Sequence, residues 1–334
     1  MVAQALLKAY AQVRRHLDTP TTYRLLDLSL HGLAELGRRG VLELGGNRLP
    51  VEVRRGVAYT GSGLLAHTLD IFIPRPRPGQ AQTHGRRPAV LYLHGGAFVA
   101  FSKDTHWPIG MLLAAQGYLV FNVNYRLAPA HPFPAALEDV CAAFGWVVEH
   151  LADYGGDPAR LALAGESAGA NLATGLAVCA CYKRPEPYAR AVFDLGVRPT
   201  AVLPACGLLQ VSNCERLLAL EPCPGWVRGL VEMVRTYYPG RASAAESGEL
   251  ADPLVLLERN ITPRRPLPPF FIPVGLSDPL LGDSQRLAAA LARQGVPCTV
   301  RYYAGEQHAF HTMLWRRPAR LCWREMYAFL RQHL

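Results

Sequence analysis

Lysine is scarce in this chain, which has only three lysines among its 334 residues, so arginine supplies nearly all of the positive charge. The formal net charge of +9 raises the question of a nucleic-acid partner. The basic residues are scattered, however, and cluster only in short pairs such as Arg86-Arg87 and Arg316-Arg317. Because no basic stretch is interleaved with aromatic residues, we interpret the charge as solvated surface and expect no nucleic-acid partner.

Long apolar runs are also missing. No segment has the eighteen or so uninterrupted apolar residues that a membrane-spanning helix needs. Residues 1–20 are amphipathic and mixed in charge, without the apolar core and small-residue cleavage site of a signal peptide. We therefore expect no stable membrane insertion.

The eight cysteines lack CxxC pairs and regular disulfide spacing. Cys179 and Cys181 are two residues apart, so on a helix they point in different directions and make a poor metal site. We expect free, mostly buried thiols in a reducing cytoplasm, with no metal centre.

From about residue 66 short apolar runs alternate with helical segments. Seven runs predict strands, at 67–73, 89–94, 118–124, 161–164, 201–205, 270–274 and 299–303. Helical patterns lie between several of them, at 109–116, 135–154, 168–181 and 284–294. Near-continuous apolar strands with intervening helices predict an α/β fold whose mostly parallel sheet is covered on both faces.

Two regions depart from this alternation. Residues 1–60 have the pattern of helices and loops, and residues 207–265 hold one predicted helix, 226–238, among prolines and glycines. We expect an N-terminal cap of helices over 1–60 and a catalytic domain over 61–334 with a cap insertion at about 207–265. Such a cap would cover the edge of the sheet where ligands bind in these folds.

The candidate nucleophile is Ser167, in the sequence Gly165-Glu166-Ser167-Ala168-Gly169. This G-x-S-x-G pattern lies between a predicted strand and a predicted helix, which is the context of a nucleophile elbow. A tight turn there exposes the hydroxyl near a helix N-terminus, whose partial positive charge favours a developing anion.

An oxyanion hole is predicted about seventy residues upstream, where a strand ends in His94-Gly95-Gly96-Ala97-Phe98. Acyl transfer needs backbone N–H groups aimed at the oxygen that becomes negative. The amides of Gly95, Gly96 and Ala97, with that of Ala168 after the nucleophile, supply such a group.

A serine nucleophile needs a base and an acid that orients it. His308 follows the last predicted strand, and Asp278 follows the strand before it. The order Ser167, Asp278, His308 is the order that this fold uses. His311 remains open as an alternative base, and Asp283 and Glu306 as alternative acids.

Together these motifs resemble the hormone-sensitive-lipase family of α/β-hydrolases, especially its bacterial esterases. The resemblance is carried by HGGAFVAFSKDTH, YRLAP, HPFPAALED, GDPARLALAGESAGANLA, DPLL and HAF. Two positions depart from the family pattern, because Ala97 stands in place of a third glycine and Ala309 in place of the glycine that usually follows the histidine.

The resemblance implies a serine carboxylesterase of the α/β-hydrolase fold that acts on small-molecule esters, with a helical cap and no cofactor. An amidase or lactonase with the same triad remains open, and so does a receptor on this scaffold. Whether the chain forms a homodimer also remains open. If the cap measures acyl length, we expect a preference peaking between about four and eight carbons, with Trp226 and Met233 among the residues that line the acyl pocket.

Overall fold

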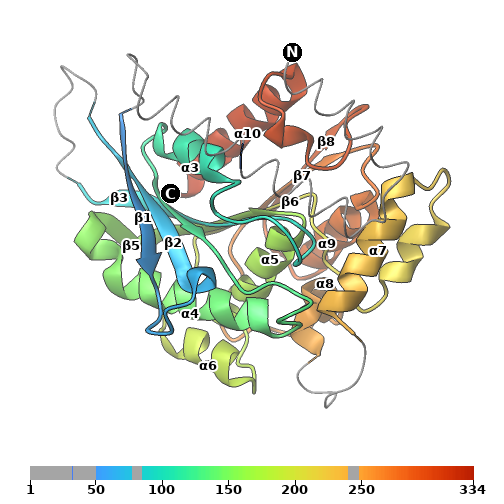
Figure 1. Ribbon diagram of the computed structural model, residues 1–334, viewed down its shortest axis with the longest axis horizontal. Helices are drawn as coiled ribbons and strands as arrows, with labels where there is room; N and C mark the ends of the chain where they lie inside the picture. The colour runs from blue at the N-terminus through green and yellow to red at the C-terminus, as the bar shows by residue number, and fades with distance from the viewer. Residues whose placement is uncertain (1–31, 33–49, 77–84, 240–247) are drawn as a thin grey trace.

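A computed structural model describes residues 32, 50–76, 85–239 and 248–334 of the chain. Its centre is an eight-stranded sheet in the order β1-β2-β4-β3-β5-β6-β7-β8 (Figure 1). The strands are β1 (Val51–Ala58), β2 (Thr68–Pro74), β3 (Arg87–Leu93), β4 (Leu119–Val123), β5 (Gly156–Glu166), β6 (Ala201–Ala205), β7 (Phe270–Gly275) and β8 (Cys298–Tyr303). The pairings β1–β2 and β2–β4 are antiparallel, and the five others are parallel. The predicted α/β class and the seven predicted strands are confirmed.

The strand β1 corrects the expectation of helices and loops through residue 60. Val51, Val53 and Val57 alternate with polar residues such as Glu52 and Arg54, which is the period of a strand with one face in water. Because β1 is at the edge of the sheet, its charged side chains stay solvated and no continuous apolar run marks it.

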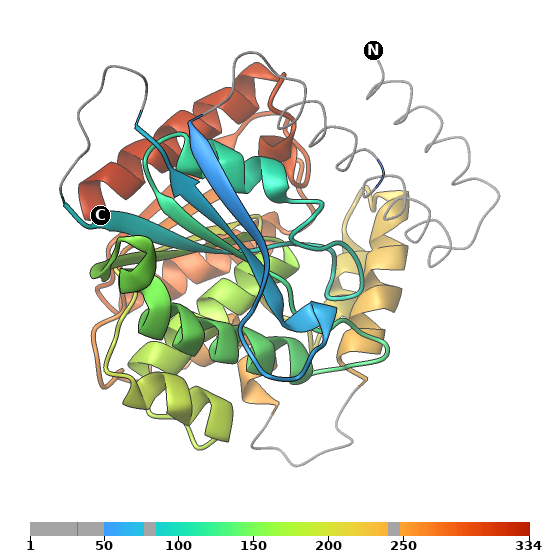
Figure 2. The same cartoon turned by 60° about the vertical axis from the view of Figure 1, so that its left-hand side comes forward.

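Helices cover both faces of the sheet. The helices α3 (Trp107–Ala114) and α10 (Arg317–His333) pack on one face, where Val90 and Tyr92 of β3 point. On the other face lie α4 (Ala135–His150), α5 (Ala168–Cys181) and α9 (Leu281–Arg293), against Leu91 and Leu93 of the same strand. The two layers are seen on opposite sides of the sheet in Figures 1 and 2, with α6 (Pro187–Asp194) outside α4. This double cover explains why the central strands are apolar throughout.

Within residues 207–265, the predicted cap insertion, the structure has α7 (Gly225–Tyr237) and α8 (Pro253–Glu258), with short 3-10 helices at Cys214–Ala219 and Glu249–Ala251. The predicted helix 226–238 corresponds to α7. Of the N-terminal cap expected at residues 1–60, residues 1–31 and 33–49 lie outside the described residues.

None of the helices that the structure describes is long and apolar enough to cross a bilayer. All eight cysteines are free, six of them buried, with Cys223 exposed and Cys298 intermediate.

Candidate active site

Ser167 occupies a strained turn between β5 and α5. Its φ of 56° and ψ of −114° lie outside the regions that ordinary residues adopt. The glycines on either side make the turn possible: a Cβ on Gly169 would lie 2.0 Å from the carbonyl oxygen of Leu93, and one on Gly165 would lie 2.5 Å from that of Gly169. The turn therefore fixes Ser167 tightly against the end of β3.

Backbone hydrogen bonds hold this strained serine in place. The Ser167 N–H donates to the carbonyl of Ala205 at the end of β6 (3.0 Å), and the Ser167 carbonyl accepts from Leu208 (3.1 Å). A strained residue persists because contacts of this kind with the surrounding structure offset the cost of its backbone conformation. The side chain is positioned at the first turn of α5, where unpaired N–H groups favour negative charge.

The loop after β3 supplies candidate oxyanion donors, and it changes the predicted set. The Gly95 N–H donates to the Glu166 carboxyl at 2.6 Å, so it is not available to an oxyanion and its expected role is wrong. The amides of Gly96, Ala97 and Ala168 have no acceptor in the part of the chain that the structure describes. They remain the candidate donors.

Left-handed backbone shapes this loop. Gly96 has a φ of 113°, and a Cβ there would lie 2.0 Å from the carbonyl oxygen of Ala100. Ala97 has a φ of 52°, a conformation that glycine adopts more easily. The alanine that stands in place of the family's third glycine thus adopts a left-handed turn and keeps its N–H.

Glu166 is a residue whose role the sequence did not reveal. Besides Gly95, its buried carboxyl contacts the Tyr92 hydroxyl, which donates to it, and His106 Nε2 at 2.7 Å. Burial raises the pKa of Glu166 to about 8. A carboxyl of that pKa is largely protonated at neutral pH and anchors the oxyanion loop without placing a full negative charge beside it.

The hydrogen-bond pattern assigns the proton on His106. Its Nδ1 lies 3.2 Å from the carbonyl oxygen of Ser102 and 2.8 Å from the Thr105 hydroxyl, whose own hydrogen goes to that same carbonyl. Nδ1 is therefore the N–H donor, and Nε2 shares one proton with Glu166.

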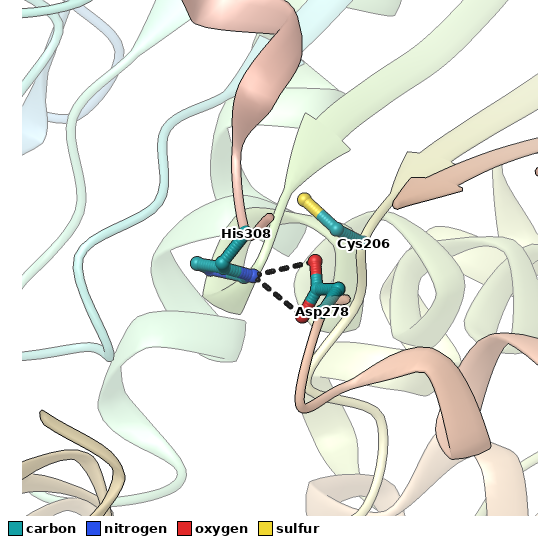
Figure 3. A group of neighbouring side chains, drawn as sticks. All are labelled: Cys206, Asp278 and His308. Atoms are coloured by element: carbon teal, nitrogen blue, oxygen red, sulfur yellow. Dashed lines mark hydrogen bonds and ion pairs between the residues drawn. The ribbon is translucent and has the colours of Figure 1, made fainter. Parts of the chain in front are cut away.

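His308 and Asp278, the predicted base and acid, lie within hydrogen-bond distance of each other. His308 Nδ1 lies 3.1 Å and 3.0 Å from the two carboxylate oxygens of Asp278 (Figure 3). The loops that carry them are joined by the Ser277 N–H, which donates to the Glu306 carbonyl at 2.9 Å. The carboxylate also accepts from the Leu280 N–H at 2.8 Å, which fixes its orientation. Nε2 is left to face a nucleophile, the tautomer that a general base requires.

Charge and burial act in opposite directions on His308. Burial lowers its pKa, but the neighbouring Asp278 carboxylate and Cys206 sulfur together outweigh burial and raise the pKa well above the ordinary 6.5. The pair thus stabilises a protonated imidazole, which is what accepting a proton from serine demands.

The two alternative acids have other partners, and the alternative base is buried, with no hydrogen-bond partner for its Nδ1 among the described residues. Asp283 accepts from the Leu209 amide (2.9 Å) and pairs with Arg216 (2.6 Å), and Glu306 pairs with Arg316 (2.7 Å). His311 is buried, and burial lowers its pKa to about 3. The ion pairs therefore connect Asp283 to Arg216 and Glu306 to Arg316.

Cys206 is a neighbour of the His308–Asp278 pair, and the sequence did not indicate this proximity. It follows β6, is fully buried, and brings its sulfur beside Asp278 and His308 (Figure 3). The three residues come from three different loops, so no spacing in the sequence could have indicated the group. Burial raises the pKa of the thiol, which therefore stays protonated at neutral pH.

Ser167 and His308 both line one cavity of about 450 Å³. Gly96 and Ala97 border it on the oxyanion side, together with His106 and Glu166. From α7, Trp226, Leu230 and Met233 form an apolar wall, and the Trp226 ring is tilted against His308 with centroids 5.5 Å apart. A nucleophile, a base and amide donors therefore share a pocket whose other walls are mostly apolar.

The tyrosine–arginine motif lies beneath this site. The Tyr125 ring stacks on His94 (centroids 4.2 Å apart), and its hydroxyl donates to the His94 carbonyl at 2.6 Å. Arg126 pairs with the buried Asp139 at 2.7 Å. These contacts fix the base of the oxyanion loop, as expected of scaffolding.

Comparisons with known proteins agree with this geometry. A family model described as the α/β-hydrolase fold matches residues 90–312. Esterase LipI and carboxylesterase NlhH of Mycobacterium tuberculosis are 35% and 33% identical to this chain, over 69% and 63% of it. The matched parts cover 66% and 62% of those two proteins.

Solved structures are similar over nearly the whole chain. The crystal structure of esterase LipW from Mycobacterium marinum superposes with a TM-score of 0.72 at 24% identity, and the comparison covers 93% of this chain and 89% of that one. At that identity the likeness shows the fold. The chain therefore belongs to the α/β-hydrolase fold family, in agreement with the hormone-sensitive-lipase resemblance of its motifs.

Proposed function

We propose that this chain is a serine carboxylesterase that hydrolyses small-molecule esters of short- to medium-chain acids through an acyl-enzyme. The observation that carries the proposal is the strained Ser167 in one cavity with His308, whose other ring nitrogen is held by Asp278. Two relatives that are named as esterases support the same activity.

In the proposed first step the Ser167 hydroxyl attacks the ester carbonyl carbon while His308 Nε2 takes the hydroxyl proton. The carbonyl oxygen becomes negative and is held by the amides of Gly96, Ala97 and Ala168. Collapse of the tetrahedral intermediate breaks the bond to the alcohol oxygen, which receives the proton from His308.

In the second step water replaces the alcohol. His308 takes a proton from the water, the hydroxide adds to the acyl carbon, and collapse releases the acid and restores the Ser167 hydroxyl. No electron is transferred and every proton passes through His308, so the proposed reaction requires no cofactor.

An amidase or lactonase would use the same steps with another leaving group, so the test compares leaving groups directly. Hydrolysis of p-nitrophenyl esters of graded acyl length is measured beside the matching p-nitroanilides. We expect turnover of the esters and little turnover of the anilides. If the anilides were hydrolysed faster than the esters, the proposed function would be amidase rather than esterase.

Ser167→Ala tests the nucleophile in the same assay. We expect a loss on the order of 10⁴-fold or more in kcat with the fold intact. Ser277→Ala is the matched control, because this exposed serine is adjacent to Asp278 and its side chain is outside the cavity. A folded Ser167→Ala protein that keeps more than a few per cent of the activity contradicts the assignment.

The free cysteines are consistent with a reducing compartment, so we also propose a cytoplasmic location.

A further inference from the structure

Cys206 holds its position by an unusual backbone conformation. Its φ is 40°, in the left-handed region that non-glycine residues seldom enter. Its N–H donates to the Pro273 carbonyl of β7 at 3.0 Å, so the residue is fixed between the ends of β6 and β7. A strained conformation of this kind persists only where surrounding contacts hold it. At Cys206 it directs the thiol towards Asp278 and His308.

The resulting group has the composition of a metal site. The Cys206 sulfur, a carboxylate oxygen of Asp278 and a ring nitrogen of His308 all lie within 4.8 Å of one another. No other set of three or more such side chains among the described residues meets this criterion. Thiolate, imidazole and carboxylate are the three ligand types that Zn²⁺ and similar thiophilic cations take, in tetrahedral geometry.

The spacing of the His308–Asp278 pair is close to what such an ion needs, and the Cys206 sulfur lies within 4.8 Å of both. Bonds of about 2.0 Å to nitrogen and oxygen and about 2.3 Å to sulfur separate tetrahedral ligands by roughly 3.3–3.6 Å. The His308–Asp278 separation of 3.0 Å is a few tenths of an ångström shorter. A small opening of the pair would therefore admit a cation between them.

We propose that Cys206, Asp278 and His308 form an inhibitory site for a thiophilic divalent cation such as Zn²⁺ or Cd²⁺. Binding sends the thiol proton of Cys206 to solvent, and the metal takes the Nδ1 lone pair of His308. The single proton of the neutral imidazole then moves from Nδ1 to Nε2, so Nε2 has no free lone pair and no longer serves as the base. The inhibition rests on the proposed serine mechanism, whereas the binding does not.

The cation reaches the site from the substrate cavity. His308 lines the cavity and its side chain is 19% exposed, whereas Cys206 and Asp278 are buried behind it. The imidazole must swing aside to admit the ion. We therefore expect inhibition to develop slowly and to be prevented while an acyl group or an inhibitor fills the cavity.

The inhibition arm uses the full-length chain, freed of metal, with a p-nitrophenyl ester as substrate. Zn²⁺ is titrated into the wild type, Cys206→Ala, Cys206→Ser and Cys223→Ala, and each rate is divided by the same protein's metal-free rate. Loss of a direct ligand should weaken inhibition by at least about 100-fold in both Cys206 variants. Cys223→Ala, which removes the exposed thiol, should match the wild type, and a chelator should restore activity.

The binding arm uses Cd²⁺ and needs no activity. The ultraviolet absorption of a cadmium–thiolate bond is followed in Ser167→Ala, with and without a Cys206→Ala change. We expect the absorption in Ser167→Ala and its loss in the double variant. Its loss with Cys206 supports the site even if the chain hydrolyses none of the esters, an outcome that overturns only the proposed function.

Two results overturn the inhibitory site. One is cadmium–thiolate absorption that persists without Cys206 and disappears in Cys223→Ala. The other is a Zn²⁺ inhibition curve that is the same in the wild type and in folded Cys206→Ser.

Discussion

His308 sets the expected dependence of the reaction on pH, because only its neutral imidazole can take the serine proton. In spite of burial, Asp278 and Cys206 together raise the pKa of His308 well above 6.5. We therefore expect kcat/KM to rise with pH through one ionisation that lies above the ordinary histidine value. The measurement is the pH profile of ester hydrolysis for the wild type and Asp278→Asn.

Asp278→Asn should lower kcat by roughly 10⁴-fold and shift the ionisation to lower pH, because the charge that raises the pKa is gone. The contribution of the pair to stability falls as pH rises, whereas activity rises with pH. A raised histidine pKa stabilises the fold below the pKa of the unfolded chain, and the stabilisation is lost as pH rises through the folded value. Asp278→Asn should thus cost more thermal stability at acid pH than at alkaline pH; an unmoved ionisation in this variant would contradict the pairing.

Glu166 acts on the reaction through the loop that it holds, and so is a positioning residue. Its contact with the Gly95 N–H fixes the segment that carries Gly96 and Ala97. Glu166→Ala should lower kcat by up to about 100-fold, with KM little changed, because the donors are then misplaced for the oxyanion only. Glu166→Gln should recover much of this loss, since its amide oxygen still accepts from Gly95.

A second measurement tests whether Glu166 holds a proton in the folded protein. The pKa of Glu166 is about 8 in the folded protein against 4.5 for an ordinary glutamate, so the folded state keeps a proton that the unfolded chain releases between these values. The melting temperature of the wild type should therefore fall relative to that of Glu166→Gln as pH rises from about 4.5 to 8. A constant difference across that range would show that Glu166 is already ionised in the fold.

At the scale of elements, we expect α7, which lies in the predicted cap insertion, and the core strands to have separable tasks. The strand ends carry Ser167, Asp278 and His308, and α7 supplies an apolar wall through Leu230 and Met233. Each methylene buried against such a wall contributes about 0.8 kcal/mol, which is close to a fourfold gain in kcat/KM. A wall at fixed depth therefore favours longer chains only up to a limit.

Met233→Ala should move the preferred acyl length towards longer chains while barely changing turnover of acetate esters. Trp226 is less suited to this test, because its ring also contacts His308. Val231→Ala is the control, since Val231 is buried in the same helix but does not line the cavity. If Met233→Ala and Val231→Ala lost activity equally on every chain length, α7 would support the structure without determining the acyl-length preference.

For the whole molecule, the sequence predicted those features that local pattern encodes. The central strands are buried on both faces and so have continuous apolar runs, and Ser167 is marked by the small residues that its turn requires. The strand β1 was missed because it lies at an edge and its residues alternate. Two features of the site depend on tertiary contacts and so cannot be predicted from the spacing of residues in the sequence. They are the hydrogen bond from the Gly95 N–H to Glu166 and the proximity of Cys206 to His308.

The state of the cysteines gives a prediction for the whole chain. All eight are free, but only Cys223 is exposed, and Cys298 is partly accessible. Buried thiols react only when the structure opens, so native protein treated with a thiol reagent should show one fast reaction, one slower one and then a plateau. In denaturant without reductant all eight should react at once, and Cys223→Ala should remove the fast phase alone. Fewer than eight reactive thiols in denaturant would reveal a disulfide, and a reducing compartment would then be the wrong assignment.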